Sequence, residues 1–215
     1  MHPGGSFGES LLTFHDTTLA VLNVLFTIIA FISAYRLYSI KSVNLNFIHL
    51  ALLEKIYTIV PVVILAILGF PSINMIYYLE ESYLSSLTVK VTGNQYYYQY
   101  GYSFRLNYPI DSYMVPLEDL GRGDTYLEEV TEILAVPIGV YVRFLVTSND
   151  VIHSYSLPAL ALKIDAVPGR INSVTTLFNR AGFYYGQCSE LCGANHAFMP
   201  IVVATLPLEF FSEQS

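Results

Sequence analysis

The chain has 215 residues, of which 53% are hydrophobic, and its mean hydropathy of +0.49 is too high for an ordinary water-soluble domain. The formal net charge is −7, an acidic balance that disfavours nucleic acid as a partner. The apolar residues are unevenly distributed along the chain, so their positions decide the class of protein.

Two uncharged segments are long enough to cross a membrane. Residues 17–35 carry no charge over 19 positions, and residues 56–79 carry none over 24. A bilayer core of about 30 Å needs roughly 20 apolar helical residues, so we expect both segments to span it. A buried core helix is the alternative, and it fits these lengths poorly. No basic region precedes the first segment and no cleavage pattern follows it, so we expect a retained anchor and not a signal peptide.

Charges beside the two segments predict their orientation. The connection at 36–55 carries Arg36, Lys41 and Lys55 against one acid, Glu54, whereas the residues before the first segment include acids but no Lys or Arg. Positive charge stays on the inner side of a membrane. We therefore expect the connection to face the cytoplasm or matrix and both termini to lie in the periplasm or intermembrane space.

The remaining residues are long enough for one globular domain. β-branched and aromatic residues dominate four segments, which are separated by clusters of Gly, Pro, Asn and Asp: 87–93, 95–104, 139–148 and 200–206. Residues 124–134 show a helical period but fit a loop and strand equally well. The pattern predicts an antiparallel sandwich or small barrel held above the membrane by a helical hairpin. We expect an outer segment at 1–16, a membrane hairpin at 17–82 and an outer domain at 83–215.

Both cysteines of the chain lie in one short loop near the C-terminus. The spacing C-x3-C-x3-H-x2-M lets this loop present Cys188, Cys192, His196 and Met199 to one point. Thiolate, imidazole and thioether ligands together favour copper, whereas zinc rarely uses Met. His153 follows a predicted strand, from which its loop could fold back on the cysteine loop. Two thiolates can bridge two copper ions that each take one imidazole, and such a filled site suits electron transfer better than substrate turnover.

Two simpler interpretations of the cysteines remain open from the residues alone. An oxidising outer compartment would allow a disulfide between them. A structural zinc site with two cysteines and two histidines is the second alternative.

Over nearly its whole length the chain resembles subunit II of the haem–copper cytochrome c oxidases. The hairpin, "DSYMVP", "LVTSNDVIHSYSLPALALKIDAVPGRIN" and "GFYYGQCSELCGANHAFMPIVV" carry the resemblance. It implies a two-helix transmembrane hairpin followed by an all-β, cupredoxin-like Greek-key barrel with a dinuclear copper centre, CuA. It also implies a subunit of the proton-translocating oxidase, complex IV of the respiratory chain, in contact with subunit I, other subunits and membrane lipid.

The same resemblance implies a role for each residue of the metal site. In the family, two cysteines bridge the coppers, and the resemblance gives this role to Cys188 and Cys192. The two terminal histidine ligands would be His153 and His196. The axial ligands would be Met199 and the main-chain carbonyl of Glu190. The carboxylate of Glu190 would also bind a magnesium ion shared with subunit I. The spans contain no plausible pair of haem ligands, so the haems and the oxygen chemistry are expected in subunit I.

The resemblance also implies that cytochrome c donates electrons to this chain through an exposed aromatic residue. Tyr96 occupies the position of the family's electron-accepting tryptophan, and the chain contains no Trp at all. Tyr57 and Tyr155 also stand where the family has Trp, which indicates a loss of Trp throughout the chain. A strand aromatic that only packs an edge is the alternative for Tyr96.

Acidic residues that meet the lysines of cytochrome c in the family are largely missing after the aromatic block. Their positions are taken by Gly101, Phe104, Arg105, Leu106 and Asn107. The acids that remain as docking candidates are Asp111, Glu118, Asp119 and Asp124. Because complementary charge mainly sets the association rate, we expect docking that depends less on salt than is usual in the family.

Glu54 lies at the inner end of the second span and matches the family acid at the mouth of a proton-uptake path in subunit I. An ionisable residue at a membrane boundary is a candidate for function, although Glu54 is also simply beside Lys55 in a charged connection.

Other classes of protein fit the sequence less well. Quinol oxidase subunits lack the copper ligands and nitrous oxide reductase lacks the hairpin, whereas a membrane-anchored copper-binding or zinc-stabilised structural module remains conceivable. We expect a mitochondrial inner-membrane protein, with a bacterial plasma membrane as the alternative.

Overall fold

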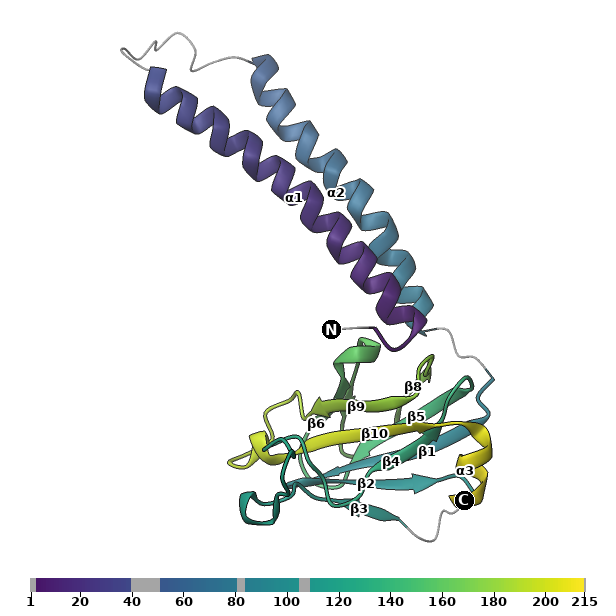
Figure 1. Cartoon of the computed structure of the whole chain (residues 1–215). Coiled ribbons are helices and arrows are strands. Elements are labelled where there is room, and N and C mark those ends of the chain that lie inside the picture. Colours follow the sequence, from purple (N-terminus) through teal and green to yellow (C-terminus); the bar gives the residue numbers. More distant parts are fainter. Residues whose placement is uncertain (1–2, 40–50, 81–83, 105–108, 215) are drawn as a thin grey trace. The chain divides into compact units, whose positions relative to one another are not determined.

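The computed structural model describes residues 3–39, 51–80, 84–104 and 109–214 (Figure 1). The chain divides into two compact units, one of Ser10–Tyr78 and the other of Met1–Glu9 with Leu79–Ser215. Several residues used in the sequence predictions lie outside the described ranges: Lys41, Arg105, Leu106 and Asn107.

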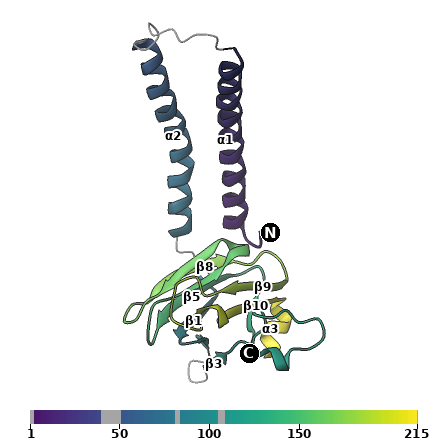
Figure 2. The same cartoon turned by 90° about the vertical axis from the view of Figure 1, so that its left-hand side faces the viewer.

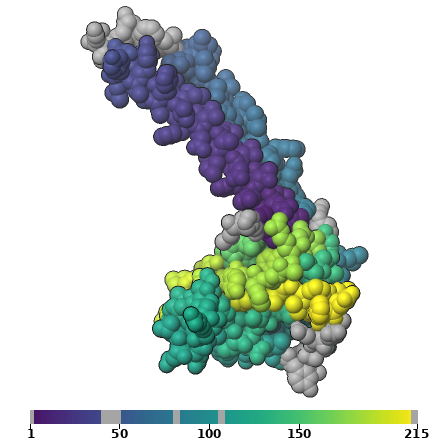
Figure 3. All heavy atoms as spheres, in the orientation of Figure 1, coloured from purple at the N-terminus to yellow at the C-terminus, as the bar shows by residue number. Residues whose placement is uncertain are grey.

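Two long helices form the first unit, as predicted. Helix α1 spans Ser6–Ser39 and helix α2 spans Ala51–Glu80, and each is long and apolar enough to cross a membrane. None of the apolar stretch of either helix is buried, and Figure 3 shows the atoms of α1 at the surface on the face turned to the viewer. Four threonine hydroxyls within the helices donate to the main-chain carbonyl four residues earlier. Thr27 Oγ1, for example, donates to the carbonyl of Asn23 at 2.7 Å, which satisfies this hydroxyl within the helix.

Ten strands and a short C-terminal helix build the second unit. The strands are β1 (Leu87–Asn94), β2 (Tyr97–Tyr102), β3 (Ile110–Ser112), β4 (Leu134–Pro137), β5 (Tyr141–Ser148), β6 (His153–Leu157), β7 (Leu162–Ala166), β8 (Asn172–Leu177), β9 (Gly182–Gln187) and β10 (Pro200–Leu206), followed by α3 (Leu208–Gln214). They form sheets of order β3-β2-β1-β5-β8, β4-β10-β9 and β6-β7. Figure 2 shows β8, β5 and β1 on one side of the unit and β9 and β10 on the other.

The predicted antiparallel pairing holds for most of the strand pairs but is wrong for two of them. β1 pairs with β5 in parallel, placing Val89 opposite Phe144, and β10 pairs with β4 in parallel, placing Val203 opposite Leu134. Alternation of apolar residues indicates which face of a strand is buried, but it does not indicate whether the neighbouring strand runs parallel or antiparallel. Strands that are joined by long connections can pair in parallel. Residues 124–134 form turns and the start of β4 and not a helix.

Aromatic side chains fill the centre of the second unit. In β2 and β5 every second residue is buried, as the predicted alternation requires. Tyr155 is fully buried, and its ring meets the ring of Tyr98 edge to face at a centroid distance of 5.4 Å. The ring centroids of Phe144 and Tyr155 are 5.7 Å apart, so Tyr155 of β6 packs against aromatic rings of two strands, β2 and β5, of the five-stranded sheet. A position where the resemblance implies Trp thus serves as core packing.

Three connections meet at one end of this unit. The main-chain N–H of Asn149, after β5, donates to the carbonyl of Gly93 at the end of β1. The N–H of Ser189, after β9, donates to the carbonyl of Ser154 in β6 at 3.0 Å. The β1–β2 turn, the β5–β6 loop and the β9–β10 loop therefore lie together.

Strands β9 and β6 lie close together at Gly186, and from this contact we predict how its replacement changes stability. A Cβ atom at this position would collide with the carbonyl oxygen of Ser156, whereas a Cβ at Gly101 in β2 would meet its nearest atom, the Cβ of Lys90, at 3.9 Å. Gly186→Ala should therefore destabilise the unit by about 1–3 kcal/mol, as overpacking does. Gly101→Ala should be neutral or slightly stabilising. Thermal unfolding of the detergent-solubilised chain, followed by circular dichroism, checks this, and equal shifts in both variants would contradict it.

Candidate metal centre

The β9–β10 loop is closed by its own main chain. The N–H of Cys188 donates to the carbonyl of Met199 at 3.1 Å, which brings the two ends of the loop together. Gly193 has φ of +136°, a conformation that favours glycine, and so lets the loop turn back between Cys192 and His196. His196 begins a short 3-10 turn, His196–Phe198. The compact spacing of the sequence motif thus becomes a compact loop.

The sulfur atoms of Cys188 and Cys192 face each other without bonding. Their Sγ atoms are 4.0 Å apart, about twice the length of a disulfide bond, and both cysteines are free and buried. The structure therefore does not contain the disulfide that the sequence left open.

Further donor atoms flank each sulfur. His153 Nδ1 lies 3.9 Å from the sulfur of Cys188, and His196 Nδ1 lies 3.4 Å from that of Cys192. The Met199 sulfur is 3.6 Å from the Cys192 sulfur, and the Glu190 carbonyl oxygen is 3.4 Å from the Cys188 sulfur. Two donors that share one tetrahedral metal lie about 3.5 Å apart, given bond lengths near 2.0 and 2.3 Å. These separations fit metal ligation, with one imidazole beside each sulfur.

A narrower cluster stands out within this set. The ligand atoms of His153, Cys188 and Cys192 lie within 4.8 Å of one another, and all three residues are buried. A buried set of imidazole and thiolates is a soft ligand environment, which together with Met199 suits copper.

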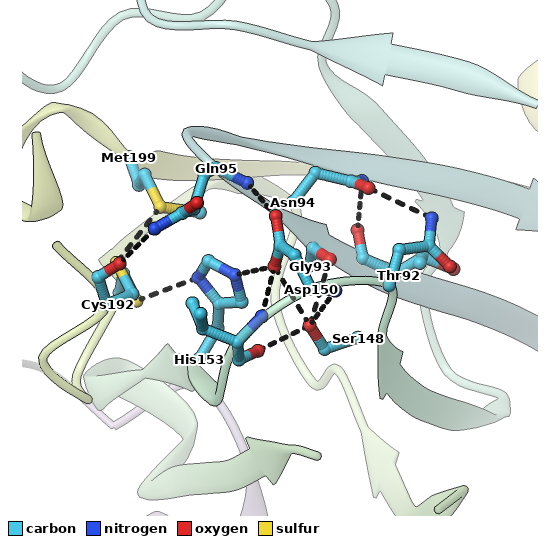
Figure 4. Close-up of polar contacts among 12 residues, drawn as sticks. Thr92, Gly93, Asn94, Gln95, Ser148, Asp150, His153, Cys192 and Met199 are labelled. Atoms are coloured by element: carbon cyan, nitrogen blue, oxygen red, sulfur yellow. Dashed lines mark hydrogen bonds and ion pairs between the residues drawn. The ribbon is translucent and has the colours of Figure 1, made fainter. Parts of the chain in front are cut away.

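His153 is oriented by Asp150. The imidazole is fully buried, and its Nε2 lies 2.8 Å from Asp150 Oδ1 (Figure 4). A ring that donates from Nε2 to a carboxylate keeps the lone pair on Nδ1, the atom that faces Cys188. Gly93 leaves room for the ring, because a Cβ there would lie 2.8 Å from His153 Cδ2.

The same contacts shift several pKa values in the metal-free chain. Burial raises the pKa of Cys188, but hydrogen bonds with His153 and with main-chain groups of Ser154 and Glu190 outweigh it and lower that pKa to about 6. Burial and the negative charge of Cys188 raise the pKa of Cys192. One thiol of the pair is therefore ready to lose its proton at neutral pH, as a metal ligand must.

Tyr96 reaches the loop as well. It is half-buried at the β1–β2 turn. Its hydroxyl lies so close to Gly193 that a Cβ atom on that residue would collide with it. The structure thus brings the predicted electron-accepting aromatic against the cysteine loop.

The remaining predicted residues lie elsewhere. Glu54 is exposed in the first turn of α2, in the helical unit. Asp111 accepts a hydrogen bond from Gln99 Nε2, and Asp124 accepts one from the N–H of Gly121. Glu118 and Asp119 are exposed in a 3-10 turn. None of these acids contacts the candidate ligands in the described part of the chain.

Sequence reasoning missed three residues around the centre. Asp150 orients His153, and Gln95 donates from its amide to the carbonyl of Cys192 at 2.7 Å. Tyr98 is buried with its hydroxyl donating to the carbonyl of Ser154 and its ring edge to face with that of His153. Only Asp150 had a signal in the sequence, as an acid three residues before a candidate ligand.

Comparison with known proteins gives consistent matches over both units. The family described as cytochrome c oxidase subunit II matches twice, its periplasmic domain at residues 87–206 and its transmembrane domain at residues 5–75. Cytochrome c oxidase subunit 2 of Aedes aegypti is 42% identical over 203 residues, which cover 94% of this chain and 89% of that protein. The same subunit of Branchiostoma floridae is also 42% identical, over 94% of this chain and 88% of that protein.

A solved structure matches the second unit. The periplasmic domain of subunit II of the cytochrome oxidase of Bradyrhizobium japonicum is 39% identical, with a TM-score of 0.57. The match covers 62% of this chain and 94% of that domain. The structural match agrees with the expected cupredoxin-like fold, although hydrogen bonding leaves the sheets separate and does not close a barrel.

The different pKa values of the two thiols lead to a prediction for the reduced, metal-free chain. Ultraviolet thiolate absorbance should rise with an amplitude of one cysteine as the pH passes through about 6, because the pKa of Cys188 is low and that of Cys192 is high. Cys188→Ser should remove this step. Cys192→Ser is the matched control and should retain it. A step of two cysteines at neutral pH would contradict the assignment.

Proposed function

The chain belongs to the cytochrome c oxidase subunit II family, and from this membership we propose that it takes electrons singly from cytochrome c through a dinuclear copper centre and passes them to the low-spin haem of subunit I. As a family member it is part of the oxidase complex and pairs with other oxidase subunits. The observation that carries the proposal is a pair of buried, reduced sulfurs with one imidazole beside each.

Six residues would hold the metal. Those that offer side-chain donors are Cys188, Cys192, His153, His196 and Met199, and Glu190 offers its carbonyl oxygen. Two copper ions bound there would supply a one-electron carrier with charge shared over both sulfurs. The protein's part is to keep the sulfurs apart, to hold the imidazoles in place and to exclude water. The burial of Cys188, Cys192 and Met199 supports that part.

The carboxylate of Glu190 would bind a second metal ion, a hard cation that prefers oxygen ligands. Its carbonyl faces Cys188 while its side chain is exposed, so one residue can contribute to two sites. Carboxylate oxygen is a ligand that magnesium prefers. We propose that this carboxylate binds a magnesium ion shared with subunit I.

Cytochrome c would dock where the β1–β2 turn meets the cysteine loop. Tyr96 lies against Gly193 in that loop and would be the first residue to accept the electron. Asp111, Glu118, Asp119 and Asp124 are exposed and would contribute the remaining attraction for a cationic partner.

The proposed membrane placement rests on the two helices and the charges beside them. Helices α1 and α2 would cross the membrane in contact with lipid and subunit I, with the copper domain and both termini on the outer side. We propose the mitochondrial inner membrane, with a proton-translocating oxidase. The bacterial plasma membrane, with the copper domain in the periplasm, is the alternative.

Copper loading of the detergent-solubilised full chain tests the metal assignment. A dinuclear centre should give near-infrared absorption and an electron paramagnetic resonance signal in which one electron couples equally to two copper nuclei. Cys192→Ser removes one of the two sulfurs that would hold the metal and should abolish the equal coupling. A colourless, signal-free protein that retains zinc would instead support the structural-module alternative.

Tyr96→Leu should slow reduction of the copper centre by cytochrome c, because leucine lacks the ring that lies against the loop. Stopped-flow reduction of the oxidase complex measures the rate, and Tyr126→Leu, a change at an exposed tyrosine in another loop, is the control. An unchanged rate in the first variant would remove Tyr96 from the path. The same measurement across ionic strengths should show a shallow dependence, since few docking acids remain.

Glu54→Gln should slow proton uptake by the complex if Glu54 stands at the mouth of the proton path, because glutamine cannot exchange a proton. Proton uptake during turnover, measured in vesicles with a pH-sensitive dye, checks this. Lys55→Gln, a neighbouring change of charge, is the control. Normal uptake in Glu54→Gln would leave Glu54 as an ordinary charged residue of the connection.

A further inference from the structure

We propose that Gln95 is a positioning residue that holds the two halves of the metal centre at a fixed separation. The inference rests on the proposed copper centre and concerns how this chain builds it. Gln95 is not a metal ligand. It acts through Asp150 and the carbonyl of Cys192.

The two halves come from different sheets. His153 begins β6, which pairs with β7, whereas the cysteine loop joins β9 to β10. Ladder hydrogen bonds within each sheet therefore do not fix the distance from His153 to the sulfurs. One main-chain hydrogen bond joins them on one side, from the N–H of Ser189 to the carbonyl of Ser154. Beyond this bond and the 3.9 Å contact of His153 Nδ1 with the Cys188 sulfur, a third element also links the two halves.

Gln95 supplies this further link from the β1–β2 turn. Its main-chain N–H donates to Asp150 Oδ2 at 2.6 Å, and its side-chain amide donates to the carbonyl of Cys192 at 2.7 Å. The other oxygen of Asp150 holds His153 Nε2 at 2.8 Å. A continuous chain of hydrogen bonds thus runs from His153 through Asp150 and Gln95 to Cys192 (Figure 4).

The carboxylate at the middle of this chain is itself held firmly. Asp150 Oδ1 also accepts the N–H of Val151 at 2.6 Å and lies 3.2 Å from the hydroxyl of Ser148. The same hydroxyl lies 3.2 Å from the carbonyl of Gly93, next to the turn that carries Gln95. Because its carboxylate is held in place, Asp150 fixes the imidazole of His153 relative to the β1–β2 turn.

The amide group of Gln95 is chemically required for the contact with Cys192. A carbonyl oxygen needs a donor, and replacing the amide by a carboxylate would place two acceptors face to face. The amide also lies against the following residue, because a Cβ on Gly193 would be 3.0 Å from Gln95 Nε2. Tyr96 contacts the same glycine, so one turn carries both the positioning residue and the proposed electron acceptor.

Loss of the Gln95 amide should release the Cys192 side of the centre alone. The main-chain contact with Asp150 persists in any variant, so His153 stays oriented. The carbonyl of Cys192 would be free to rotate, and the sulfurs of Cys192 and Met199, 3.6 Å apart, would move with it. The two metal positions would then become unequal.

The first experiment compares Gln95→Glu and Gln95→Ala with Gln99→Glu in the copper-loaded full chain. Gln99 is the matched control, since it lies in β2 and its amide makes one hydrogen bond to Asp111 at 2.7 Å, away from the cysteine loop. Both Gln95 variants should shift the near-infrared band and make the coupling to the two copper nuclei unequal. The control should match the wild type. Unchanged spectra at full copper loading would overturn the proposal.

The second experiment needs no copper. Amide hydrogen–deuterium exchange of the metal-free chain should rise about three- to tenfold at residues 188–197 in Gln95→Glu, the effect of losing one hydrogen bond to the main chain. Strands β1 and β5 should exchange as in the wild type. Unchanged exchange in the loop, or equal acceleration everywhere, would overturn the proposal. If the wild type shows no dinuclear copper spectrum, the proposed function fails, and exchange alone judges Gln95.

Discussion

The separation of two buried thiols is the constraint on which the metal centre depends. At 4.0 Å the sulfurs of Cys188 and Cys192 are too far apart for a disulfide and close enough to share metal ions. Closure of the loop by the Cys188–Met199 hydrogen bond keeps them there, and the turn at Gly193 places His196 beside the second sulfur. Burial then leaves neighbouring polar groups to satisfy the thiols in place of water.

Polar groups around the centre form one connected set. Asp150 touches His153, Gln95, Val151 and Ser148, so an exposed carboxylate organises a fully buried imidazole. Such second contacts fix the orientation of a metal ligand. They also explain why residues from three connections are needed.

Two tyrosines of this Trp-free chain have different surroundings. Tyr155 is packed among Tyr98 and Phe144 in the core, where its ring serves as bulk. Tyr96 instead remains half-buried at a turn, with its hydroxyl against Gly193. Of these two tyrosines, at positions where the resemblance implies Trp, one packs in the core and the other lies beside the cysteine loop.

The sequence by itself determined the two apolar helices, the alternating strands and the ligand types of the cysteine loop. These features depend on residues within a few positions of one another, where spacing fixes geometry. Tertiary structure alone decided the parallel pairing of β1 with β5 and the contacts of Gln95, which lies 55 residues from Asp150 and 97 from Cys192. Periodicity carries no information about such contacts, because strand order and loop closure bring these residues together only when the sheets have packed.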